Sequence, residues 1–136
     1  MSFLVDTNVV SELRKGRRAS TKVRGWIASV ADDELYLSVL VIGELRQGIE
    51  GLRRRDPNTA TTLERWLREL VESYEDRVLP VDAAVADQWG RLSVPDPISA
   101  VDGLLAATAL VHHLTLVTRN VRDLQRTGVK HLDPFA

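Results

Sequence analysis

Two observations predict an α/β fold, with a short parallel sheet of four to five strands flanked by helices. The apolar runs are short and continuous, as in Phe3-Leu4-Val5, which is typical of strands that are buried on both faces. Segments with helical patterns separate these runs, and regular alternation of strand and helix indicates a parallel sheet. The length of 136 residues and the 44% hydrophobic content are typical of one globular domain over 1–136.

The expected elements follow from these patterns in chain order. Strands are expected at 3–5, 35–37, 78–81, 114–118 and 129–132. Helices are expected at about 7–13, 23–30, 38–52, 59–74, 83–92 and 99–113. Sheets of this kind place their functional sites at the carboxyl ends of the strands.

In the first half of the chain, polar residues start the helices. Asp6 ends the first apolar run, and Thr7 and Asn8 supply the residue types that begin helices. The segment 14–24 contains six basic residues and no acid, which indicates a solvated loop that opens the next helix. Ser38 follows the second strand and can cap the third helix.

In the second half, a break at 53–58 precedes a helix whose apolar residues recur every three or four positions. Pro80 suggests a strand end or an edge, and Asp82 can cap the helix that follows. The segment 94–97 contains two prolines and cannot be helical throughout. Residues 99–113 are almost wholly apolar, which predicts a buried helix.

The composition excludes several classes of function. The net charge is −1, so nucleic-acid binding by bulk positive charge is not expected. The absence of cysteine excludes disulfides and thiolate metal sites, and it fits a cytoplasmic location. No apolar run reaches the ~20 residues of a membrane span, and the first residues do not resemble a signal peptide. Common phosphate-binding glycine loops and the GxSxG nucleophile motif are also absent.

Three carboxylates stand at positions that stability alone does not explain. Asp6 ends a buried strand, although it could simply cap a helix. Glu44 falls within the apolar half of its helix, where an internal ion pair is the alternative. Asp102 is the one charged residue between Ser99 and Val111, and its alternative is a gap open to solvent.

A hard divalent cation would resolve the repulsion among three converging acids. Mg²⁺ takes oxygen ligands, Mn²⁺ can substitute for it in such sites, and either ion can assist phosphodiester hydrolysis. The polar turn Thr118-Arg119-Asn120-Val121-Arg122-Asp123 follows the fourth strand and could join this site, although it also has the composition of an ordinary turn.

Four motifs then occur in order along the whole chain: VDTNVVSEL, SVLVIGELRQGI, DGLLAATA and LVTRNVRDL. Together they resemble the PIN-domain family, and within it the VapC-type toxins of toxin–antitoxin pairs. The resemblance implies a PIN-like three-layer fold and a Mg²⁺- or Mn²⁺-dependent endoribonuclease. It also implies an RNA substrate, a cognate antitoxin, and a homodimer or a heteromeric toxin–antitoxin assembly.

The resemblance carries the family's metal-binding carboxylates over to Asp6, Glu44 and Asp102. The family's small polar residue beside the first acid corresponds to Thr7 or Asn8, and its residue after the fourth strand corresponds to Thr118. Many relatives have an acid where this chain has Asn120, and Asp123 is the nearest acid, so a second metal site is in question.

Basic residues near helix ends could contact RNA phosphates, although a merely solvated surface is an equal alternative. The expected set is Arg14, Lys15, Arg17, Arg18, Arg53 and Arg119, with Arg54 and Arg55 beside it.

Two other functions are alternatives to the nuclease, and the sequence argues against each. A phosphoacceptor receiver domain needs adjacent acids after its first strand, which this chain lacks. A catalytically inactive PIN-like module that binds RNA or protein would gain nothing from three converging acids.

Overall fold

The computed structural model describes residues 1–122 and 124–136. Within them, a five-stranded sheet has the order β3-β2-β1-β4-β5, and every neighbouring pair is parallel. The strands are β1 (Phe3–Val5), β2 (Leu35–Ser38), β3 (Val78–Leu79), β4 (Thr115–Val117) and β5 (His131–Leu132). The helices are α1 (Thr7–Leu13), α2 (Thr21–Ala28), α3 (Val39–Arg53), α4 (Pro57–Tyr74), α5 (Ala83–Leu92) and α6 (Ala100–Val111). The predicted α/β class is confirmed.

Differences from the predicted boundaries have local causes. The break expected at 53–58 is shorter, because Asp56 caps α4 through the Thr59 amide at 3.2 Å and Pro57 takes the first helical position. Arg53 therefore belongs to α3 rather than to a loop. β3 ends at Leu79, just before Pro80, which has no N–H to donate to the ladder.

The central position of β1 determines where the site lies. β1 is hydrogen-bonded to β2 on one side and to β4 on the other, so Phe3 pairs with both Leu35 and Thr115. All three residues of β1 are buried. Because the strands are parallel, the residues that follow β1, β2 and β4 emerge at one edge of the sheet.

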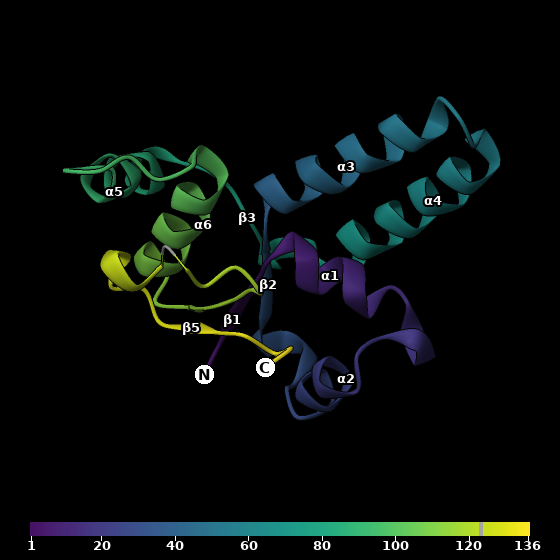
Figure 1. Ribbon diagram of the computed structural model, residues 1–136, viewed down its shortest axis with the longest axis horizontal. Coiled ribbons are helices and arrows are strands. Elements are labelled where there is room, and N and C mark those ends of the chain that lie inside the picture. Colours follow the sequence, from purple (N-terminus) through teal and green to yellow (C-terminus); the bar gives the residue numbers. More distant parts are fainter. Residues whose placement is uncertain (123) are drawn as a thin grey trace.

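Four of the six helices in the described part of the chain form two pairs. α3 and α4 lie antiparallel on one side of the molecule, and α5 packs against α6 on the other (Figure 1). α1 begins directly after β1 and lies beside the α3–α4 pair (Figure 1). Among the described residues, no helix combines the length and the apolar character needed to cross a membrane.

Candidate active site

Asp6 lies where β1 becomes α1. Its extended backbone (φ −76°, ψ 160°) ends the strand, and its Oδ1 accepts a hydrogen bond from the Thr7 amide at 2.7 Å. The backbone N–H of Asp6 also continues the sheet, by donating to the carbonyl of Val117 at 2.9 Å. The side chain is therefore both a helix cap and a buried carboxylate, with Asp6 only 7% exposed.

Thr118 and Asn8 hold the second oxygen of Asp6. Thr118 follows β4 and donates its hydroxyl to Asp6 Oδ2 at 2.7 Å. The side-chain amide of Asn8 lies 3.4 Å from the same oxygen and 3.3 Å from Thr118 Oγ1. Thr118 in turn accepts from the Asn120 backbone amide at 3.1 Å. The end of β4 is thus tied directly to the end of β1.

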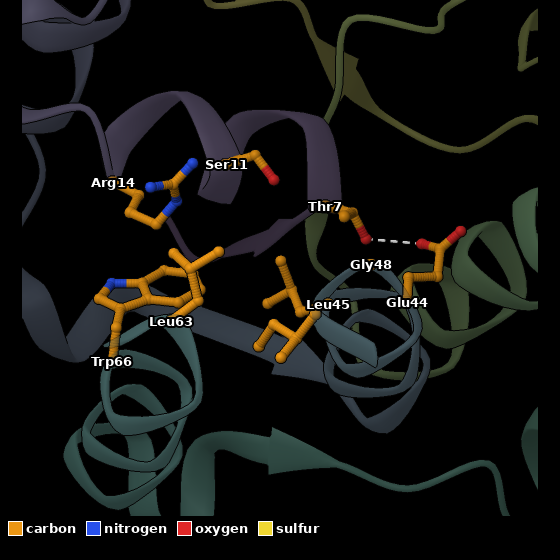
Figure 2. A pocket seen from close by; sticks show the side chains of 9 residues that line it. Thr7, Ser11, Arg14, Glu44, Leu45, Gly48, Leu63 and Trp66 are labelled. Carbon is orange, nitrogen blue, oxygen red and sulfur yellow. Dashed lines mark hydrogen bonds between the residues drawn. The ribbon is translucent and has the colours of Figure 1, made fainter. Parts of the chain in front are cut away.

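Glu44 reaches this region from the first half of α3. It is half-buried, and its Oε1 accepts a hydrogen bond from the Thr7 hydroxyl at 2.6 Å (Figure 2). Thr7 therefore bonds to Asp6 through its amide and to Glu44 through its side chain. The sequence left Thr7 and Asn8 as alternatives, and the structure brings both into contact with acids.

Asp102 lies in the first turn of α6 and is half-buried. Its Oδ2 accepts from the Ser99 hydroxyl at 2.9 Å and from the Asn120 side-chain amide at 3.2 Å. Sequence reasoning missed Ser99. Its position three residues before an acid at a helix start is the pattern that could have revealed it.

The three acids influence one another electrostatically. Burial is the main reason that the pKa of Asp6 lies above its ordinary value of 3.8. Hydrogen bonds from Thr118 and the Thr7 amide lower this pKa in part. The negative charges of Glu44 and Asp102 raise the pKa of Asp6 further. Mutual repulsion of this kind favours a cation at the site.

The donor set suits a hard cation. Asp6, Asp102, Thr118 and Asn120 line one small depression, and every donor that the described residues bring to the three acids is neutral. Among the described residues, no Lys or Arg pairs with Asp6, Glu44 or Asp102. Within the same residues, no three acidic or histidine side chains lie close enough together to hold an ion as they stand. Oxygen chemistry and uncompensated charge therefore fit Mg²⁺, while a closed ligand cage is not formed.

The basic residues predicted to contact RNA differ in their surroundings. Arg53 pairs with Glu50 and Glu64, and Lys15 pairs with Glu12. Arg14 instead lies over the ring of Trp66, and Arg119 lies over the ring of Phe135. Arg17 and Arg18 are exposed in the short 3₁₀ helix η1 (Gly16–Arg18). Asp123, the remaining predicted site residue, lies outside the described residues.

A groove of about 190 Å³ adjoins the acids. Thr7 and Ser11 of α1 and the following Arg14 form one wall, while α3 and α4 supply the other, as Figure 2 shows. Its lining is largely apolar, with Leu45, Gly48, Ile49, Leu63 and Trp66. Glu44 stands at the end of the groove nearest to Thr7 (Figure 2).

The chain is similar to known proteins over almost its full length. The chain is 30% identical over 138 residues to Toxin FitB of Neisseria gonorrhoeae, with 98% of each chain covered. It is 29% identical over 138 residues to VapC ribonuclease Y4jK of Sinorhizobium fredii, with 98% of this chain and 97% of that protein covered. The crystal structure of FitAcB from Neisseria gonorrhoeae superposes with a TM-score of 0.88 at 29% identity, covering 98% of each chain.

A family model described as "PIN domain" matches residues 3–130, which include Asp6, Glu44 and Asp102. The resemblance seen in the four sequence motifs is thereby confirmed. The chain belongs to the PIN-domain family.

Proposed function

We propose that this protein is a Mg²⁺-dependent endoribonuclease toxin that hydrolyses RNA phosphodiester bonds, and that Mn²⁺ can replace Mg²⁺. The observation that carries the proposal is that the charges of Glu44 and Asp102, from two other elements, both act on the buried Asp6. Neutral groups donate hydrogen bonds to all three acids. Relatives named as a toxin and as a ribonuclease support the same activity.

In this proposal Asp6, Glu44 and Asp102 hold the metal, and neutral neighbours orient them. Thr118 fixes Asp6 Oδ2, Thr7 fixes Glu44 Oε1, and these bonds leave the negative charge of each acid uncancelled. When bound, Mg²⁺ would supply Lewis-acid stabilisation of the phosphate and lower the pKa of water. Asn120 orients Asp102 Oδ2 and adds an amide oxygen that is neutral.

Nuclease assays with purified protein test the activity. Asp6→Asn and Asp102→Asn should each lower the rate of RNA cleavage by more than the ~100-fold that is typical of residues behind metal ligands. EDTA should abolish cleavage by the wild type, and added Mg²⁺ or Mn²⁺ should restore it. The control is Asp87→Asn, which removes an exposed acid that pairs with Arg91 on α5. Cleavage by either site variant at the wild-type rate would show that the ligand assignment is wrong.

The same assay distinguishes the proposed enzyme from the main alternative. A PIN-like module that only binds RNA or protein would show no metal-dependent cleavage of any RNA. The uncompensated charge of the acids favours the enzyme, because such charge repels phosphate unless a cation is present.

We also propose that a cognate antitoxin controls the protein in the cytoplasm, within a homodimer or a heteromeric assembly. The groove beside Glu44 is largely apolar and ends at an acid without an ion-pair partner among the described residues. An apolar antitoxin segment carrying an arginine would match both features, and its cation would compete with the metal.

A further inference from the structure

Arg119 is held in an unusual way for an exposed arginine beside an acidic site. Its guanidinium carbon lies 4.4 Å from the centroid of the Phe135 ring. Its backbone N–H donates to Asn8 Oδ1 at 3.2 Å, and Asn8 also contacts Asp6. The main chain and the side chain of Arg119 are therefore both anchored next to the proposed metal ligands.

Phe135 is itself well supported. Its ring is half-buried and packs against the hydrophobic core. Its backbone N–H donates to Asp133 Oδ1 at 2.9 Å, and Pro134 between them is buried. The segment after β5 thus presents a fixed aromatic face at the same edge of the sheet as Asp6, because β5 is parallel to β4.

An aromatic partner leaves the charge of Arg119 available. A carboxylate would neutralise the guanidinium, whereas a ring face attracts it without cancelling its charge. Among the described residues, no acid lies within ion-pair distance of Arg119. By contrast, Arg53 forms ion pairs with Glu50 and Glu64. Arg126 donates hydrogen bonds to the carbonyls of Asp96 and Pro97.

We propose that Arg119 is a pre-positioned contact for an RNA phosphate adjacent to the bond that is cut, and that Phe135 is the residue that positions it. This inference rests on the proposed nuclease function. The guanidinium fork matches phosphate oxygens, and holding it in place beforehand reduces the entropy lost on binding. An isolated acidic site repels RNA, so a fixed cation at its border also offsets that repulsion.

The test combines cleavage kinetics with binding of a fluorescein-labelled single-stranded RNA, measured by anisotropy in EDTA. Arg119→Ala should raise both KM and the RNA Kd roughly tenfold, as expected for loss of a charged hydrogen-bonded contact. The slope of log Kd against log salt concentration should become shallower by the amount expected for the loss of about one phosphate contact. The Mn²⁺ affinity measured by calorimetry should stay unchanged, since Arg119 would touch phosphate rather than metal.

Variants of Phe135 test its positioning role. Phe135→Leu keeps an apolar side chain but removes the ring face, and it should raise KM about two- to fivefold. Phe135→Trp, which keeps an aromatic face, should have a KM close to that of the wild type. A role for Phe135 in apolar packing alone would not predict this difference between Trp and Leu. Lys130→Ala serves as the matched control, because it removes an exposed cation that precedes β5, at the opposite edge of the sheet. Its KM and Kd should equal those of the wild type.

The outcomes separate this inference from the proposed function. If the wild type cleaves RNA while Arg119→Ala leaves KM and salt dependence unchanged, the phosphate contact is wrong and the nuclease stands. If the wild type does not cleave but Arg119→Ala still weakens RNA binding, the contact stands without the nuclease. If the wild type neither binds nor cleaves RNA, both are wrong.

Discussion

At the scale of single residues, each proposed metal ligand has a neutral side chain that orients it. Thr118 donates a hydrogen bond to Asp6, and Thr7 donates one to Glu44. Asp102 accepts hydrogen bonds from both Ser99 and Asn120. Hydroxyl and amide donors restrict a carboxylate without supplying an opposite charge. The site therefore keeps the repulsion that favours a cation, at some expense to the stability of the metal-free protein.

Asp6→Asn should make the metal-free protein more stable at neutral pH. Because the pKa of Asp6 is raised in the folded state, the folded protein holds this proton more tightly, and stability falls as pH rises from 3.8 through the raised pKa. Asparagine carries no charge, so the variant does not lose stability in this way as the pH rises. In EDTA the Tm of the variant should exceed that of the wild type at pH 7, and the two should converge at low pH. A lower Tm at pH 7 would mean that the carboxylate is net stabilising.

Asn120→Asp should raise the affinity for Mn²⁺ in the absence of RNA, because a carboxylate holds a hard cation more tightly than an amide does. We expect one well-occupied site in the wild type, with a second ion arriving only with substrate phosphate. Asp123→Asn should lower activity less than Asp6→Asn does. Two tight Mn²⁺ sites in a calorimetric titration of the RNA-free wild type would contradict this expectation.

At the scale of elements, the contact between α5 and α6 sets the position of Asp102. Gly103 is the next residue, and it is buried against Trp89 of α5. A Cβ at Gly103 would lie 2.7 Å from Ile98 Cγ2 and 2.9 Å from Trp89 Cδ1. The missing side chain thus allows the first turn of α6 to pack closely against α5.

Gly103→Ala should destabilise the protein by ~1–3 kcal/mol, as overpacking does, despite the ~1 kcal/mol by which helices favour alanine. Thermal or urea unfolding measures the change, and RNA cleavage should also fall because α6 carries Asp102. Gly51→Ala in α3 is the matched control, since no atom lies within 4 Å of the added carbon there. That variant should be as stable as the wild type or more stable.

At the scale of the whole molecule, the acids and the neighbouring groove form one surface on which RNA, metal and antitoxin would compete. Glu44 belongs to both, since it bonds to Thr7 at the site and lines the groove. Glu44→Ala should weaken the complex with the antitoxin, measured by calorimetry, because an antitoxin arginine would lose its partner. Unchanged affinity would remove the electrostatic part of this proposal and leave only the apolar contact.

Most of the architecture could be predicted because continuous apolar runs and helical periodicity are local signals. The sequence also predicted Asp6, Glu44 and Asp102 at one edge of the sheet, and the structure places Glu44 and Asp102 near enough for their charges to act on Asp6. Whether the three acids hold one metal stays a prediction. The contacts of Ser99 with Asp102 and of Phe135 with Arg119 did not follow. The first depends on which rotamer Ser99 adopts at a helix start, and the second joins residues after two different strands.

The central place of β1 has a consequence for the time at which the site forms during synthesis. Asp6 and Thr118, which are hydrogen-bonded, are separated by 112 positions, and β1 cannot pair with β4 until residues 115–117 have left the ribosome. Such distant pairings are late events in folding. Until then, the growing chain displays Asp6 and Glu44 without the partners that complete the site. Under the proposed function, the site of a nascent chain therefore stays incomplete, and RNA cleavage begins only once Thr118 has been synthesised and has docked beside Asp6.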